Sequence, residues 1–69
     1  MKPDQTLYRT KVAYEKHNTI LIETCFEQVA LDIAKSTISF ARVNKDVKSI
    51  YIETVEIRYI DKKVVYNNA

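Results

Sequence analysis

Apolar residues follow two different spacings along this chain. Between Thr24 and Asn44 they recur every three to four residues, whereas the segments before and after this stretch alternate apolar with polar residues. The stretch contains neither Pro nor Gly, so the pattern predicts one helix that begins near Cys25 and ends near Asn44. Thr24 and Glu27 have the spacing of a capping box, and Asn44 suits a left-handed C-cap.

The predicted helix has two sides of different character. On a helical wheel, one side is apolar and should lie on a sheet. It consists of Phe26, Val29, Ala30, Ile33, Thr37, Phe40 and Ala41. The other side is formed by Gln28, Leu31, Lys35, Ile38, Ser39 and Arg42. On this second side two aliphatic residues alternate with two cations, which is more typical of a protein-binding surface than of a solvated face. We therefore expect the stripe of Leu31, Lys35, Ile38 and Arg42 to contact a partner.

The N-terminal segment predicts a β-hairpin. Apolar and polar residues alternate over Thr6–Lys16, and the alternation resumes over Thr19–Glu23. His17 and Asn18 lie between the two runs and predict a two-residue turn in which Asn adopts a positive φ.

The C-terminal segment predicts a second hairpin. Ser49–Ile60 is rich in β-branched and aromatic residues, but its alternation slips midway, which predicts a bulge or a short break at Glu53–Thr54. Asp61–Lys62 is the predicted turn, and Lys63–Tyr66 is the returning strand. The element order is therefore ββαββ. The predicted fold is a single α+β domain, residues 1–69, in which one long helix packs on an antiparallel sheet in two layers.

Composition fits a small globular protein and argues against several other classes. The 69 residues are 46% hydrophobic and 29% charged, and the net charge is +2. This surplus is too small to indicate nucleic-acid or membrane binding by itself. No apolar run approaches the roughly 20 residues that span a membrane, and the N-terminal residues lack the apolar core of a signal peptide. The single Cys permits no internal disulfide, so we expect a reducing, cytoplasmic setting.

Candidate catalytic residues are scarce. His17 falls in a predicted turn, where it has neither a partner nor a pocket for acid–base chemistry. Cys25 falls at the first helical turn, and a packed thiol is the simplest interpretation because no second Cys accompanies it. One Cys and one His cannot build a zinc site. We therefore predict no catalytic residue, no metal, no cofactor and no enzymatic activity.

Tyrosines on the predicted strands suggest an alternative function. They are Tyr8, Tyr14, Tyr51, Tyr59 and Tyr66. With Arg9, Lys11 and Arg58 nearby, they would form a platform on which single-stranded RNA bases stack. Tyr is also a good strand residue without any ligand. A small RNA-binding module therefore stays open as an alternative.

Two segments, FARVNKDVK (residues 40–48) and YIDKKVVY (residues 59–66), resemble the Dmd-like antitoxins of T-even-like bacteriophages. That family has a Y-A-x-V-N-K helix end, an early Val-Lys and then an I-D-D-K-K-V hairpin turn. The matching residues here are Phe40, Ala41, Val43, Asn44, Lys45, Val47, Lys48, Ile60, Asp61, Lys62, Lys63 and Val64. The match covers about a quarter of the chain. A Trp in the middle of the family's helix is replaced by Lys35, and extra residues lengthen the third strand.

The resemblance implies a phage-encoded antitoxin that binds and inhibits a host endoribonuclease toxin of the RnlA or LsoA type, and so protects phage mRNA. Such a protein would act in the cytoplasm of the infected bacterial host. The family's toxin-contacting Asn at the helix end corresponds to Asn44. The predicted partner-binding residues are therefore Leu31, Lys35, Ile38, Arg42, Asn44 and Lys45. We expect no membrane or nucleic-acid partner, while an exposed strand edge would allow a homodimer. Another small phage anti-defence protein, of the anti-CRISPR kind, is a second alternative, because small ββαββ proteins recur among these.

Overall fold

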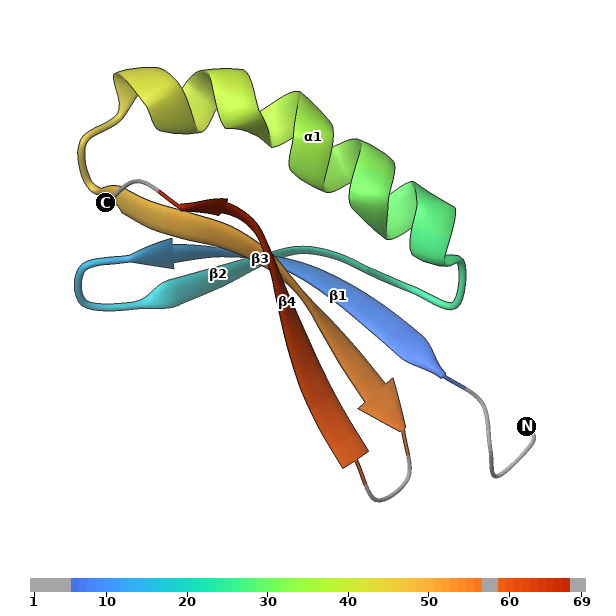
Figure 1. The fold of residues 1–69 in the computed structure, drawn as a ribbon. Helices are drawn as coiled ribbons and strands as arrows, with labels where there is room; N and C mark the ends of the chain where they lie inside the picture. The colour runs from blue at the N-terminus through green and yellow to red at the C-terminus, as the bar shows by residue number, and fades with distance from the viewer. Residues whose placement is uncertain (1–5, 57–58, 68–69) are drawn as a thin grey trace.

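The computed structural model describes residues 6–56 and 59–67, and these fold as strands and one helix in the order ββαββ (Figure 1). The elements are β1 (Leu7–Tyr14), β2 (Asn18–Thr24), α1 (Glu27–Val43), β3 (Val47–Glu56) and β4 (Tyr59–Asn67). The fold is α+β, as the sequence pattern predicts. Among the described residues, no helix is long and apolar enough to cross a membrane.

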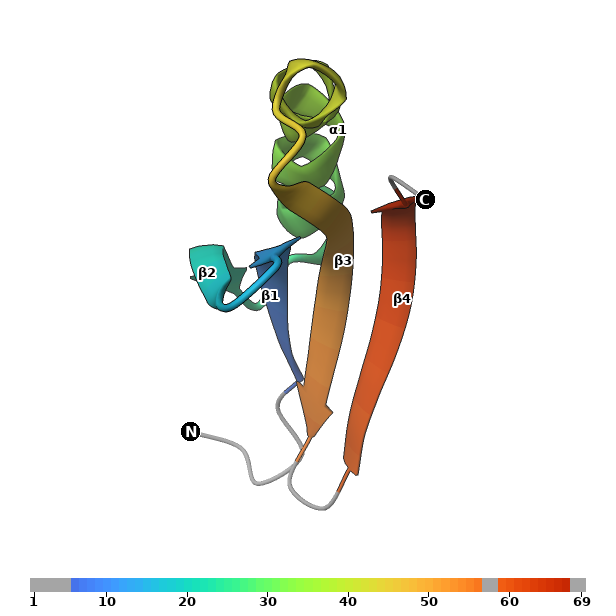
Figure 2. The ribbon, with the colours of Figure 1, turned by 90° about the vertical axis from the view of Figure 1, so that its left-hand side faces the viewer.

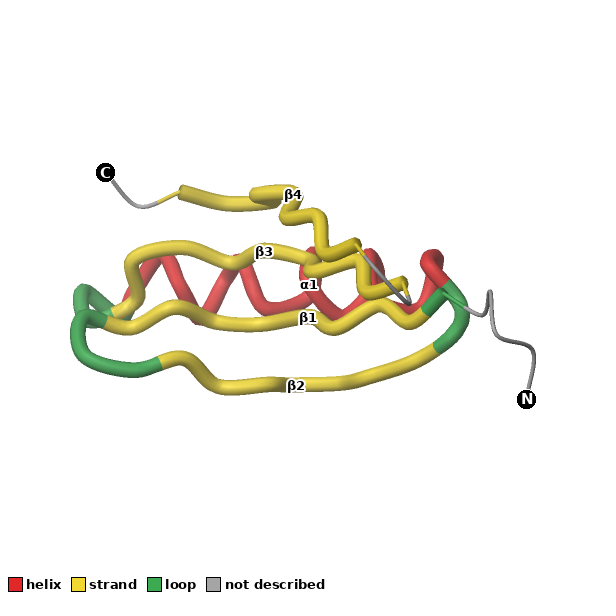
Figure 3. Tube along the Cα trace, turned by 90° about the horizontal axis from the view of Figure 1, so that it is seen from below, coloured by secondary structure: helices red, strands yellow, loops and turns green. Residues whose placement is uncertain are grey.

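The strands form one antiparallel sheet in the order β2-β1-β3-β4. The first hairpin contributes β1 to the centre of the sheet and the second contributes β3, so that the two hairpins meet along β1 and β3. Seen from below, α1 lies behind these two central strands (Figure 3). The helix therefore covers one face of the sheet, and no second layer of described residues covers the opposite face. Figure 2 shows β2 and β4 on either side of the central pair.

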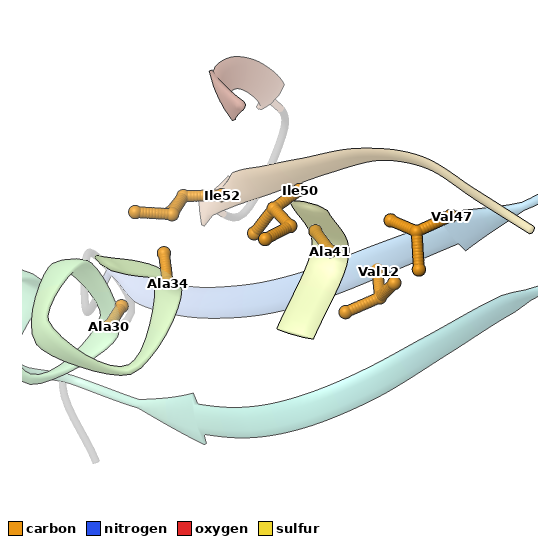
Figure 4. Packing of buried hydrophobic residues seen from close by; sticks show 7 residues of the cluster. All are labelled: Val12, Ala30, Ala34, Ala41, Val47, Ile50 and Ile52. Atoms are coloured by element: carbon orange, nitrogen blue, oxygen red, sulfur yellow. The ribbon is translucent and has the colours of Figure 1, made fainter. Parts of the chain in front are cut away.

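The core is the contact between α1 and the central strands. Val12 of β1 and Val47 and Ile50 of β3 are fully buried beneath three alanines of the helix (Figure 4). Thr10 is also fully buried, and its hydroxyl donates a 2.8 Å hydrogen bond to the Ala30 carbonyl. Alanine side chains are short, so the helix backbone approaches the sheet closely enough for a strand side chain to reach it.

Both ends of α1 differ from the predicted caps. The helix begins at Glu27 after Phe26, which makes no side-chain cap, and the Thr24 hydroxyl accepts from the Phe26 N–H at 3.1 Å. The predicted capping box is therefore wrong, because Thr24 lies three residues before the first helical residue and turns the chain there instead of capping the helix.

The C-terminal cap of α1 is likewise not left-handed. Asn44 has φ −112°, and no described residue has a positive φ. Its side-chain oxygen accepts from the Asp46 N–H at 3.0 Å, and its carbonyl accepts from the Val47 N–H at 3.2 Å. These bonds form an Asx turn that ends the helix without backbone strain, so the predicted left-handed cap is wrong.

The first hairpin turn also avoids positive φ. Residues 15–17 connect β1 to β2, the Tyr14 N–H donates to the His17 carbonyl at 2.8 Å, and Asn18 is already the first residue of β2. The predicted two-residue turn at His17–Asn18 is therefore wrong, because one more residue spans the gap in ordinary conformations.

The second hairpin is longer than predicted. Asp61 and Lys62 lie within β4, opposite Thr54 and Glu53, and the β3–β4 connection falls at residues 57–58, outside the described residues. The predicted turn at Asp61–Lys62 is therefore wrong.

The predicted bulge at Glu53–Thr54 is wrong as well. The register of β3 shifts at Ala13/Tyr14 against β1 and at Ile50/Tyr51 against β4, and pairing runs unbroken from Ile52 to Glu56. The apolar residues of β3 change face because the helix does not cover its far end. Val55 lies on the open face, opposite Leu7 and Ile60.

Candidate protein-binding surface

Small residues define the side of α1 that faces the sheet. Ala30, Ala34 and Ala41 are fully buried. Leu31 and Ile38 are half-buried and pack against the same core, so the prediction that they face outward is wrong. The physical reason is the close approach that alanine permits: with the alanines centred on the sheet, the longer aliphatic side chains on one flank reach the core from the side.

Large apolar residues on the other flank are exposed. Phe26 is 65% exposed, Phe40 is 46% exposed and Val43 is 83% exposed, although Phe26 and Phe40 were predicted to face the sheet. With the exposed Val29 and the half-buried Ile33, they follow one another along the chain at intervals of three, four, seven and three residues. This spacing places them in one row along the helix. We call this row the apolar ridge: Phe26, Val29, Ile33, Phe40 and Val43.

Cations lie on the opposite flank of the outer helix surface. Lys35 and Arg42 are exposed, as predicted, and Lys45 is exposed in the turn after the helix. None of the three forms an ion pair with another described residue. Their charges are therefore available to a partner. We call these residues the cationic flank.

Asn44 has a structural role of its own. It is half-buried, and its carboxamide oxygen is engaged by the Asp46 N–H. Replacing it would change the turn between α1 and β3 together with any contact it makes, so its part in partner binding stays a prediction.

The open face of the sheet is crossed by a row of alternating charges. Register places Glu23, Arg9, Glu53 and Lys62 side by side on β2, β1, β3 and β4. Arg9 pairs with Glu23 and, at 3.4 Å, with Glu53, which also accepts from Lys11 at 3.1 Å. The hydrogen bond that Arg9 donates to the Glu23 carboxylate is the main reason that the pKa of Arg9 is raised. Arg9 therefore links three strands through the two glutamates, whereas the Lys62 ammonium contacts the Tyr51 ring, so the row leaves little charge available to a ligand.

Tyr51 lies on the open face and is nevertheless only 3% exposed. The Lys62 ammonium lies 4.4 Å from the centre of its ring, and Asn18 donates a 3.2 Å hydrogen bond to its hydroxyl. Side chains of three strands therefore cover this face where the helix does not.

The tyrosines do not form the platform that RNA binding requires. Tyr8, Tyr14 and Tyr66 pack against the core, Tyr51 is buried on the other face, and Tyr59 is exposed near the β3–β4 connection. The described tyrosines therefore form no shared stacking surface, because Tyr8, Tyr14 and Tyr66 lie on the face that α1 covers and Tyr51 lies on the other face.

Among the described residues, neither the His17 ring nor the Cys25 thiol forms a hydrogen bond or an ion pair with a carboxylate. The exposed His17 ring stacks on Tyr14 with centroids 4.7 Å apart, beside an open hollow of about 430 Å³ at the β1–β2 turn. Cys25 is exposed before the helix and is not the packed thiol that was predicted. The described residues contain no group of three or more His, Cys, Asp or Glu that could hold a metal ion.

Comparison with protein families, with curated proteins and with solved structures found no match to this chain. The outer surface of α1, with the apolar ridge on one flank and the cationic flank on the other, is therefore the candidate site on physical grounds alone.

Proposed function

We propose that the protein is a phage-encoded antitoxin that binds a host endoribonuclease toxin of the RnlA or LsoA type and inhibits it, which protects phage mRNA in the cytoplasm of the infected bacterium. The observation that carries the proposal is the outer surface of α1, where large apolar side chains are exposed on one flank and cations without a described ion-pair partner lie on the other. Contiguous exposed apolar groups of this kind often mark the sites at which proteins bind one another.

The surface suits a helix that enters a groove on its partner. The apolar ridge has the spacing with which amphipathic helices fill hydrophobic grooves. The cationic flank would meet acidic residues at the rim of such a groove, which speeds association and selects the partner. Inhibition then needs no chemistry from the antitoxin, because a bound helix blocks access to the nuclease site.

The segment that carries the family resemblance coincides with this surface. Residues 40–45 contain Phe40 and Val43 of the apolar ridge and Arg42 and Lys45 of the cationic flank. The second resembling segment, residues 59–66, lies in β4 on the opposite layer. Toxin contact is therefore assigned to the end of α1 and not to β4.

Co-expression with toxins of this class tests the proposal. The wild-type protein should restore growth of bacteria that express the matching toxin, and the two purified proteins should form a complex. Substituting two ridge residues, F40S/V43S, removes apolar contacts at the centre of the interface and should weaken binding at least tenfold. Reversing two charges, K35E/R42E, should slow association and reduce its dependence on salt.

A charge reversal at the opposite end of β3 from the α1–β3 turn is the control. Glu56 is exposed and is the last residue of β3, so E56K should bind like wild type. Failure to rescue any toxin of this class would overturn the proposal. Recovery of a different host defence protein in a pull-down would favour the anti-defence alternative instead.

A further inference from the structure

The outer edge of β4 pairs with no other strand in the part of the chain that the structure describes. β4 is an edge strand of nine residues, and its stretch from Tyr59 to Val64 pairs with β3 without a register shift. That stretch contains no Pro. β2, the other edge, is shorter and is interrupted where Leu21 is inserted opposite Thr10/Lys11. Edge strands that are long and regular are the ones that pair with another chain.

Symmetry limits how two β4 strands can pair. Two copies related by a two-fold axis perpendicular to the sheet form an antiparallel pair in which opposed residues share a face. An axis through Lys62 sets Asp61 opposite Lys63 of the second copy, and Ile60 opposite Val64. Each of these pairs occurs twice, because the axis repeats it.

Charge selects this register from its neighbours. An axis at Asp61 or at Lys63 sets that residue opposite its own copy, with like charges in contact. An axis at Val64 sets Lys63 opposite Val65 and Asp61 opposite Asn67, so no opposite charges meet. Asp61 and Lys63 are exposed and form no ion pair with another described residue. They are therefore available to a second copy, and opposite charges directly across two strands are stabilising.

The pairs on the open face are also compatible with this register. Ile60 is 63% exposed and Val64 is 52% exposed, and each would gain an apolar neighbour. Lys62 would lie on the axis, but its ammonium is drawn over Tyr51 of β3, 4.4 Å from the ring centre. This position moves the charge away from the edge and from its symmetry mate.

We propose that the partner of the β4 edge is a second copy of this chain, paired about Lys62 to give one eight-stranded sheet with both helices on the same face. This interface is separate from the outer surface of α1, and it can be tested without any toxin.

Charge reversal and its rescue test the interface. In sedimentation velocity from micromolar to millimolar concentration, the wild-type chain should show a monomer–dimer equilibrium. D61K and K63D each convert two attractive pairs to two repulsive ones and should raise the dimer dissociation constant about tenfold. The double variant D61K/K63D restores opposite charges in the same register and should return the dissociation constant to the wild-type value.

The matched control is K16D, which makes the same charge change as K63D but lies in the β1–β2 turn. The proposal would be overturned if the wild-type chain were purely monomeric, or if D61K and K63D dimerised no more weakly than K16D. It would also be overturned if the double variant did not recover the wild-type dissociation constant. Amide exchange gives a second measurement that does not rely on variants. Protection of residues 59–64 should rise with protein concentration, while that of β2 stays constant, and equal behaviour of the two edges would contradict the interface.

Discussion

The two faces of the sheet are stabilised by different kinds of interaction. The face under α1 is stabilised by the packing of apolar side chains: Val12, Ile50 and the helix alanines are fully buried. The open face is closed by polar side chains, in which Arg9 bridges two carboxylates and Lys62 covers Tyr51. Burial of apolar surface is insensitive to salt, whereas exposed ion pairs are screened by it. The difference shows how a domain with a single helix protects both faces of its sheet: the helix covers one face, and polar side chains of the strands cover the other.

Removing a buried side chain from the covered face should have the largest effect. Ile50→Ala deletes apolar volume at the centre of the core, and such cavities cost about 2–5 kcal/mol. Ile60→Ala, at an exposed position, is the matched change on the open face and should cost well under about 1 kcal/mol. Urea unfolding followed by circular dichroism measures both, and equal losses would mean that the two faces contribute alike.

Enlarging an alanine tests the close approach of the helix. Ala34 is fully buried against the sheet, so Ala34→Leu should push α1 outward and cost about 1–3 kcal/mol. Ala13 lies opposite Ser49 on the open face and is only half-buried, so Ala13→Leu should be tolerated. Thermal unfolding of the two variants decides the point, and tolerance of Leu at position 34 would contradict the tight contact.

On each face of the sheet, one hydroxyl group can be removed by a substitution that keeps the shape of the side chain nearly unchanged. Thr10→Val deletes the bond to the Ala30 carbonyl, and Tyr51→Phe deletes the bond from Asn18. Each should cost about 0.5–1.5 kcal/mol, with the larger loss at Thr10, because its hydroxyl is fully buried. Unfolding free energies measured at matched conditions give the order, and a larger loss at Tyr51 would reverse the comparison.

Charge removal on the open face should have the smallest effect and a clear salt signature. Arg9→Met deletes the bridge between Glu23 and Glu53, and ion pairs that solvent reaches contribute little to stability. The loss should shrink as salt is added, whereas that of Ile50→Ala should not. Lys48→Met, which removes a 3.9 Å pair with Glu15, is the control and should be nearly neutral.

The pH dependence of the Arg9 contribution follows from the direction of its shift. Because the pKa of Arg9 is raised in the folded protein, the stabilisation is present below the unfolded pKa. This stabilisation is lost only when the pH rises through the pKa that Arg9 has in the folded protein. Stability should therefore be independent of Arg9 titration at neutral and mildly alkaline pH, which a series of unfolding curves would check.

The sequence pattern predicted the element types and their order, and it failed on orientation. Helical spacing and alternation identify α1 and the strands, because burial on one face imposes those periods. The helical-wheel prediction oriented α1 by the hydrophobicity of its residues and therefore placed Phe26 and Phe40 on the sheet. In the structure the small alanines face the sheet instead, because they let the helix approach it closely. Asp61–Lys62 looks like a turn until Glu53 is known to lie opposite Lys62.

The charge row shows what a single sequence omits. Glu23, Arg9, Glu53 and Lys62 belong to different strands, and nothing in their spacing reveals that they become neighbours. Strand order and register are required first. Once the order β2-β1-β3-β4 is known, alternating charges at matching positions become a recognisable signal.

The meeting of the hairpins at the centre of the sheet has a kinetic consequence. Each hairpin and the helix can form from residues close together in the chain, but β1 pairs with β3 across the whole helix, as Leu7 does with Val55. Closing that long loop lowers the entropy of the chain before the core contacts that compensate for this loss can form. We therefore expect the pairing of β1 with β3 to form last and to set the refolding rate, after the two hairpins and α1 have formed.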